Sequence, residues 1–199
     1  MLTPRPYLSW TALNMVETSP AQWVKTYLYG ERIPINRGMA FGKKMADGLE
    51  SGELTGDIFL DVAMAQLPKF EIMDKEFRVE MKSGKEKIEL LCKPDTMRAD
   101  MSAFKEYKTG KTPWTQKKVD GFGQLTFYAT GMYLKTGHIP KDIELVHVPT
   151  ESQLDEKIAV TGVLLRYPTT RNMADILKMM ARISKAWAKI KILTESELL

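Results

Sequence analysis

Two acidic residues and a lysine stand close together in the middle of the sequence. Asp95 follows Pro94, and Glu106 and Lys108 stand further on, separated by one residue. In a β-strand, residues two positions apart project from the same face, so Glu106 and Lys108 are expected side by side. A tight turn before Glu106 would bring Asp95 next to them. The spacing therefore predicts two carboxylates and an ammonium group at one point.

This combination suits phosphodiester hydrolysis. Carboxylate oxygens are the hard ligands that Mg²⁺ prefers, and a bound Mg²⁺ or Mn²⁺ polarises a phosphate and lowers the pKa of a bound water. A nearby lysine can orient or deprotonate that water, or stabilise charge on the phosphoryl oxygens. Residues of these types on adjacent strands also form ordinary surface ion pairs worth under about 1 kcal/mol. The spacing alone leaves both interpretations open.

The segment before this cluster reads as a mainly helical N-terminal part, residues 1–68. Ser9 is suited to cap the first helix, and Pro20 can open the second, which Gly30 closes. Pro68 would stop the last one. The apolar spacing predicts helices over residues 10–16, 20–30, 37–50 and 57–67.

The cluster itself falls in a predicted catalytic core, residues 69–167. Alternating apolar residues predict a hairpin of two strands around Ser83–Gly84, with Asp95 on its second strand. The predicted core contains strands 70–81, 88–97, 104–108, 143–148 and 160–167, a polar loop 109–119 and a helix 120–137. An amphipathic C-terminal helix over 171–195 completes a single α/β domain of residues 1–199.

Three motifs in this order carry a family resemblance. They are Pro94–Asp95, then Glu106–Tyr107–Lys108 followed by Thr109–Gly110, and Gln124-Leu-Thr-Phe-Tyr128 on the next helix. From about residue 8 to residue 167, the chain resembles the PD-(D/E)XK nuclease superfamily, in particular its RecB-like and phage-exonuclease branch. The resemblance implies a restriction-endonuclease-like core, in which helices flank a mixed central sheet.

The resemblance also implies roles for the motif residues. Asp95 and Glu106 would bind the metal, with the Tyr107 carbonyl as an additional ligand, and Lys108 would serve the attacking water. Gln124 and Tyr128 would orient the lysine or the DNA. The alternative for this last pair is structural: Tyr128 would pack in the core and Gln124 would cap a loop.

One part of the family pattern is missing from the helix upstream. Many members of this branch carry a histidine one turn after a glycine there, but Ala46 stands in that place after Gly42. Glu50 occupies the position of the trailing acid, and Asp47 is the neighbouring alternative. Either could be the extra metal ligand, and either could be a solvated helix residue. Glu50 is the preferred ligand of the two.

Basic residues suggest where DNA would bind. Trp114 could stack on an unpaired base, and the lysines around it would offset phosphate charge. A solvated loop is the alternative interpretation. The net charge of +4 and the pI of about 9.0 permit an acidic partner without requiring one. The predicted DNA contacts are Lys111, Trp114, Lys117 and Lys118, with Lys43 and Lys44 as a second patch.

Cysteine content and hydropathy exclude other classes. Cys92 is the only cysteine, so the chain forms no intrachain disulfide and cannot supply an iron–sulfur cluster with four cysteines. No run of 18 apolar residues or apolar signal core is present, so no membrane association is expected. A cytoplasmic setting, in a bacterial or phage-infected host cell, follows as an expectation.

The leading functional prediction is a Mg²⁺- or Mn²⁺-dependent DNA nuclease. It would act on duplex ends or single strands as an exonuclease in phage-type recombination or repair, alone, as a homo-oligomer or with a recombination partner protein. Two alternatives remain open at this point. One is a catalytically silent DNA-binding or scaffold module of the same fold, and the other is a structure-specific endonuclease.

Overall fold

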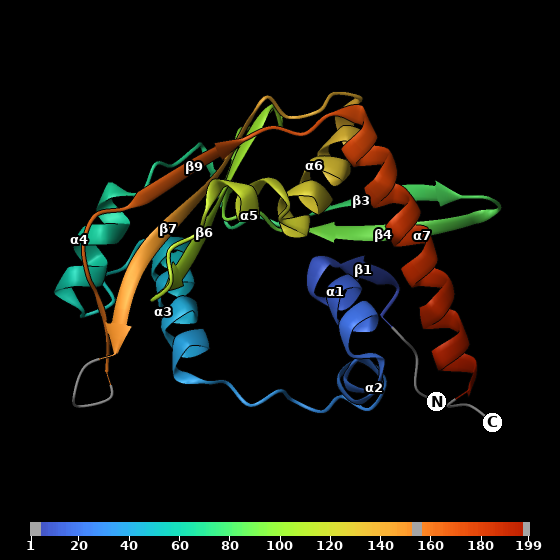
Figure 1. Ribbon diagram of the computed structural model, residues 1–199, viewed down its shortest axis with the longest axis horizontal. Helices are drawn as coiled ribbons and strands as arrows, with labels where there is room; N and C mark the ends of the chain where they lie inside the picture. Colours follow the sequence, from blue (N-terminus) through green and yellow to red (C-terminus); the bar gives the residue numbers. More distant parts are fainter. Residues whose placement is uncertain (1–4, 153–156, 197–199) are drawn as a thin grey trace.

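The computed structural model describes residues 5–152 and 157–196. Helices pack around two β-sheets, and the long C-terminal helix α7 (Met173–Ser196) runs down one side of the molecule (Figure 1). The fold is the α/β class expected from the motif order, with a mixed central sheet flanked by helices and a largely helical N-terminal region. Among the described residues, no helix combines the length and apolar character needed to cross a membrane.

The N-terminal region begins with a short strand that the sequence pattern did not predict. Ser9 ends this strand and also caps the first helix, because its hydroxyl accepts a hydrogen bond from the Ala12 amide. The strand pairs in parallel with a distant partner, so no local periodicity marks it. The elements are β1 (Tyr7–Ser9), α1 (Trp10–Thr18), α2 (Pro20–Trp23), the π-helix η1 (Val24–Leu28), α3 (Arg37–Ser51) and α4 (Ile58–Gln66).

The predicted hairpin is present but shorter than expected. Strands β3 (Phe77–Ser83) and β4 (Glu86–Cys92) pair antiparallel, and Gly84 adopts a positive φ of 60° in the turn between them. Together with β1 they form a separate three-stranded sheet in the order β1-β4-β3. The predicted strands 70–81 and 88–97 were therefore too long, since each is split between two sheets.

The second sheet contains the remaining parts of the two predicted strands 70–81 and 88–97, together with the longer strands β6 and β7. Its order is β2-β5-β6-β7-β8, and β9 also pairs with β7. Strands β6 and β7 run parallel and form the longest pairing, from Ala103–Asp142 to Gly110–Pro149. The predicted strand 160–167 is likewise split in two. The strands are β2 (Ile72–Met73), β5 (Thr96–Met97), β6 (Ala103–Gly110), β7 (Asp142–Ser152), β8 (Ile158–Val160) and β9 (Leu165–Thr169).

Alternation along β6 and β7 divides the interior into two cores. Phe104 and Leu145 belong to the larger core, which contains the buried faces of α1, α7 and α6 (Gly123–Thr136). Tyr107 and Val146 belong to the smaller core, beneath α3 and α4. Because neighbouring strand residues point to opposite faces, β6 has helices on both sides. Packing on both faces thus holds in place the strand that carries Glu106 and Lys108.

The predicted polar loop 109–119 is only partly a loop. Strand β6 continues to Gly110, and a short helix α5 (Gln116–Asp120) follows, capped by the Thr115 hydroxyl, which accepts from the Lys118 amide. Its apolar anchor is Val119, which is fully buried in the larger core. The abundance of polar residues hid this helix, because a helix this short needs only one buried side chain to dock.

Candidate active site

Asp95 lies in the break between β4 and β5, not on a strand as predicted. Two backbone contacts fix it there. Its carbonyl accepts a hydrogen bond from the Asp74 amide at 2.9 Å, and its carboxylate Oδ2 accepts one from the Tyr107 amide at 2.6 Å. The second contact ties the side chain directly to the middle of β6. The chain leaves one sheet and joins the other at this point, so the carboxylate can turn toward the neighbouring strand.

Glu106 and Lys108 project from the same face of β6, as their spacing predicts. The Lys108 ammonium donates to Glu106 Oε1 at 2.6 Å. The Glu106 side chain is only 4% exposed, whereas that of Lys108 is 30% exposed. The other Glu106 oxygen, Oε2, is buried and has no hydrogen-bond partner. A buried carboxylate oxygen without a partner is costly and calls for an explanation.

Gln124 and Tyr128 stand one turn apart on α6 and share a face. The Gln124 amide donates to Glu106 Oε1 at 2.7 Å and to the Tyr128 hydroxyl at 2.9 Å. Tyr128 is buried and packs edge-on against Phe104, with ring centroids 6.0 Å apart. Gln124 therefore positions Glu106, while Tyr128 holds Gln124 and fills the core. The resemblance implies that this pair orients the lysine or the DNA; in the structure Gln124 bonds to Glu106 Oε1, the same oxygen that Lys108 contacts.

The three motif residues meet in one cavity of about 530 Å³ between α3 and β6. Asp95, Glu106 and Lys108 all line it, as does Tyr107. The opposite wall is the face of α3 that carries Gly38, Met39, Gly42, Met45, Ala46 and Leu49. The predicted convergence of two carboxylates and one ammonium group is thus present in the structure.

Burial and mutual charge shift the ionisation of this cluster. Burial raises the pKa of Asp95 well above its usual range, and the nearby Glu106 charge raises it further. The hydrogen bond from the Tyr107 amide lowers this pKa, but by less than burial and charge raise it. Burial also raises the pKa of Glu106, although Lys108 opposes this. Burial acts to lower the pKa of Lys108, but its ion pair with Glu106 outweighs that effect and raises it. Two acids that resist ionisation beside one fixed cation form a site that favours a further positive charge.

The oxygen atoms of this cluster are of the type that a hard divalent cation takes. The unpartnered Glu106 Oε2, the Asp95 carboxylate and the Tyr107 carbonyl are of the ligand type that Mg²⁺ or Mn²⁺ takes. In the part of the chain that the structure describes, no three His, Cys, Asp or Glu side chains are grouped so as to hold a metal ion. The protein would thus provide few ligands, as is usual for Mg²⁺, which keeps several waters.

A third acidic residue, Asp74, belongs to the surroundings of the site and was missed in the sequence. It has a positive φ of 45°, and its side chain is 12% exposed and paired with Lys93 at 2.9 Å. Its negative charge contributes to raising the pKa of both Asp95 and Glu106. The break in apolar alternation after Ile72 and Met73 was the signal that the chain turns here.

The structure places Glu50 outside the residues that line the cavity. Its carboxyl is exposed, and a shared hydrogen bond with Asp74, followed by that residue's charge, raises the pKa of Glu50. The phase of α3 explains this, because Ala46 and Leu49 occupy the wall and Glu50 emerges beyond it. Asp47 lies on another face of α3, paired with Lys43 at 2.6 Å. Glu50 is therefore linked to the site indirectly, by its hydrogen bond with Asp74.

We expect the acids around Asp95 to differ sharply in importance. Asp74→Asn and Glu50→Gln should each weaken cleavage at limiting Mg²⁺ by at least about tenfold, because they remove negative charge that attracts the cation. Asp47→Asn, which breaks only an exposed ion pair, should match the wild type. The measurement is initial rate against Mg²⁺ concentration. Superimposable curves for all three variants would confine metal binding to Asp95 and Glu106.

The predicted DNA contacts near β6 are only partly free to bind. Lys118 Nζ lies 4.2 Å from the centroid of the Trp114 ring, and that ring packs against Phe122 at 4.8 Å. A base could stack on this face of Trp114 only after Lys118 moved away. Lys111 and Lys117 are exposed. Lysine side chains thus surround this segment, but Lys118 covers the face of Trp114 on which a base would stack.

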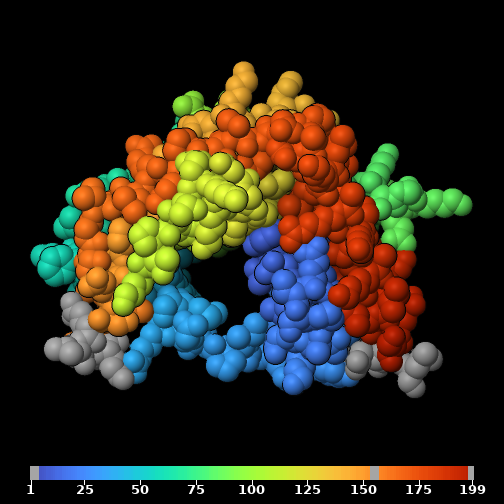
Figure 2. Space-filling view, in the orientation of Figure 1, coloured from blue at the N-terminus to red at the C-terminus, as the bar shows by residue number. Residues whose placement is uncertain are grey.

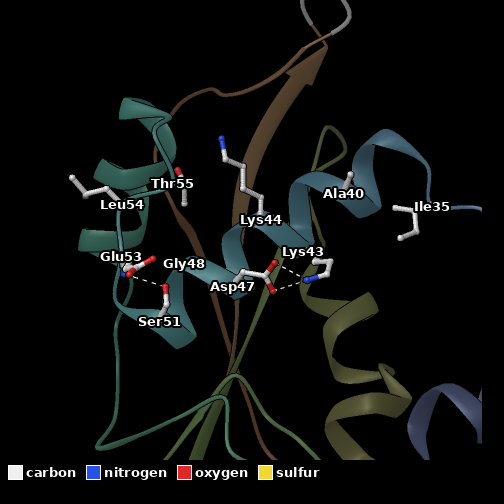
Figure 3. Close-up of a pocket in the computed structure, with 10 residues that line it drawn as sticks. All are labelled: Ile35, Ala40, Lys43, Lys44, Asp47, Gly48, Ser51, Glu53, Leu54 and Thr55. Carbon is white, nitrogen blue, oxygen red and sulfur yellow. Dashed lines mark hydrogen bonds and ion pairs between the residues drawn. The ribbon is translucent and has the colours of Figure 1, made fainter.

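The second predicted patch is not part of the cavity that Asp95, Glu106 and Lys108 line. Lys43 and Lys44 line a separate cavity of about 500 Å³ on another face of α3, which Leu54 and Thr55 help to close (Figure 3). Figure 3 shows Lys43 turned toward Asp47 and Lys44 projecting away from that pair. A contact between these lysines and DNA would therefore lie outside the cavity that holds Asp95 and Glu106.

No protein-family model matches the sequence, and no curated protein matches it. Solved structures do. The crystal structure of SSO0001 matches 96% of this chain and 79% of its own, at 15% identity and a TM-score of 0.46. The crystal structure of LHK-Exo in complex with dAMP is similar at 14% identity, over 96% of this chain and 91% of that one, with a TM-score of 0.50. The mixed sheet flanked by helices and the fold likeness to LHK-Exo are consistent with a restriction-endonuclease-like α/β core with an N-terminal helical region.

Proposed function

We propose that this protein is a metal-dependent nuclease that hydrolyses phosphodiester bonds in DNA. The observation that carries the proposal is the state of Glu106. One of its oxygens is held by Lys108 and Gln124, and the other is buried without a hydrogen-bond partner. Glu106 and Asp95 line the same cavity. A folded protein keeps such a carboxylate when a ligand offsets its burial. The fold similarity to LHK-Exo, solved with dAMP, supports the same class of activity.

The residues in and around the cavity would have separate roles. Asp95, Glu106 and the Tyr107 carbonyl would hold Mg²⁺ or Mn²⁺, which supplies a polarised phosphate and a water of lowered pKa. Lys108 keeps its proton, since its pKa is raised, so it would stabilise charge on the phosphoryl oxygens and orient the water rather than deprotonate it. Gln124 holds Glu106 in one rotamer. Its hydrogen bond with Tyr128 anchors that arrangement in the core.

The substrate and the setting follow from the same proposal. Lys111 and Lys117 are exposed beyond the end of β6, where they would offset backbone phosphate charge. We propose DNA ends or single strands as the substrate, and a role of the exonuclease type in phage-type recombination or repair.

A direct assay tests the activity. Purified protein is incubated with linear and circular DNA, labelled at the 5′ or the 3′ end, in Mg²⁺, Mn²⁺ or EDTA. We expect release of label with either metal and none in EDTA, and the Asp95→Asn protein controls for contaminating nucleases. Retention of DNA without degradation across pH 7 to 9 would instead identify a silent binding module. Cleavage of closed circles into linear products would identify an endonuclease.

A further inference from the structure

An exposed segment ends at the edge of the cavity that Asp95, Glu106 and Lys108 line. Residues 29–36, called here the strap, connect η1 to α3 and are exposed along their whole length. In Figure 1 the strap runs as an extended chain between the α1–α2 region and α3, away from the sheets. Figure 2 shows an opening between the strap, α1, α3 and the yellow-green segment around α5. The strap therefore forms one edge of a hollow and is not buried against the body of the protein.

Contacts close the remaining perimeter of this opening. Lys108 Nζ lies 5.9 Å from the centroid of the Phe122 ring, and Phe122 packs edge-on against Trp10 with centroids 6.2 Å apart. Trp10 begins α1, and the chain continues through α2 and η1 into the strap and α3. Helix α3 returns to β6 across the cavity, where a Cβ at Gly42 would lie 3.4 Å from Thr109 Oγ1. The strap thus completes a ring.

The catalytic cavity adjoins this ring. Asn36, at the end of the strap, lines the cavity together with Asp95, Glu106 and Lys108. A cavity of about 530 Å³ has the size of sites that enclose a drug-sized ligand, which suits a nucleotide better than a length of duplex. The segment between β6 and α6, which borders the opening in Figure 2, carries Lys111, Lys117 and Lys118. These cations would draw a phosphate backbone toward the opening.

From this geometry we infer that the strap makes the site a threading site, which accepts an unpaired strand only by a free end. This inference rests on the proposed function and adds its substrate class. A strand without ends cannot pass through a closed ring, whereas a strand with an end can. The strap would thus exclude closed circles by topology, independently of the residues that carry out hydrolysis.

Opening the strap tests the inference. A recognition sequence for a site-specific protease is inserted after Ile33, where an exposed backbone tolerates change. After cleavage, the N-terminal piece should stay docked, since Leu13, Val16 and Trp23 are buried in the larger core. The matched control carries the same insertion after Gly84, at the exposed β3–β4 turn. The substrates are one single-stranded sequence in linear and in covalently closed circular form, with Mg²⁺.

The intact protein should cleave the linear strand at least about tenfold faster than the circle. Cleaving the strap should raise the rate on the circle to near that on the linear strand, and the control should stay like the intact protein. A linear strand with bulky protein blocks at both ends should behave like the circle. Equal cleavage rates on the linear and the circular strand in the intact protein would overturn the threading inference but not the proposed function. An unchanged circle rate after strap cleavage, with the linear rate retained, would also overturn it. No cleavage of any DNA would overturn the proposed function.

Discussion

Replacing Lys108 with alanine should lower the rate of DNA cleavage by about 10² or more, the usual scale for a lost electrostatic or acid–base group at the reacting centre. The ammonium group is held on Glu106 Oε1 at 2.6 Å, inside the cavity that also contains Asp95. It keeps its proton in this position. The loss should therefore fall on turnover more than on DNA affinity.

The same change has a consequence for stability that must be measured beside the rate. Without Lys108, Glu106 keeps only the Gln124 amide as a polar partner. Leaving a buried charge without its ion is strongly destabilising. We expect Lys108→Ala to unfold at a lower temperature than the wild type in EDTA, and Mg²⁺ to reduce the difference because it would bind the same carboxylate.

Two further variants separate catalysis from folding. Lys85→Ala removes an exposed lysine at the β3–β4 turn, to which no role in binding or catalysis is assigned, and should leave both turnover and stability close to wild type. Lys108→Arg keeps the positive charge beside Glu106, so it should restore stability while cleavage stays impaired, because the guanidinium differs in shape from the ammonium. Wild-type turnover in folded Lys108→Ala would remove this residue from the mechanism.

The motif residues could be predicted because their placement depends on local rules. Alternation along a strand sets Glu106 and Lys108 side by side, and a helical turn sets Gln124 beside Tyr128. Ser9 capped α1 as its residue type predicted. Each of these relations involves residues a few positions apart. They are therefore visible in the sequence without knowledge of the fold.

Relations between distant segments could not be predicted in this way. Strand β1 exists only because β4 supplies its hydrogen bonds. Asp95 leaves the hairpin because the chain changes sheets there, and Glu50 misses the cavity because the packing of α3 on β6 sets its phase. The cover of Lys118 over Trp114 is likewise a tertiary contact. Such features depend on long-range packing, which composition and periodicity do not encode.

The Asp95→Asn protein should be inactive and, without metal, more stable than the wild type at neutral pH. The asparagine side chain retains an oxygen that can accept the Tyr107 amide hydrogen bond, at the position where Oδ2 accepts it at 2.6 Å. It lacks the charge, and burial followed by the Glu106 charge disfavours that charge in the folded protein. Losing a group that binds the metal should abolish cleavage in Mg²⁺ and in Mn²⁺.

The difference in stability between the Asp95→Asn protein and the wild type should depend on pH, in a direction set by the pKa shift of Asp95. Because the pKa of Asp95 is raised in the folded protein, its contribution to stability is fully present below the pKa of the unfolded chain, and is lost as pH rises through the folded pKa. The neutral amide of the variant does not titrate, so it does not undergo this loss. The advantage of the variant should therefore be small at pH 4 and larger at pH 7.

Thermal unfolding in EDTA and in Mg²⁺ would measure this effect. At pH 7 in EDTA, the variant should melt at least about 2 °C higher, the shift that roughly 1 kcal/mol produces in a domain of this size. Saturating Mg²⁺ should reverse the order, because a ligand that binds only the folded wild type raises its stability. The variant should not gain this stability, because the Tyr107 carbonyl and Glu106 would not hold the ion without Asp95. A variant that melts below the wild type in EDTA, or gains as much from Mg²⁺, would show that Asp95 is a structural carboxylate and not part of a metal site.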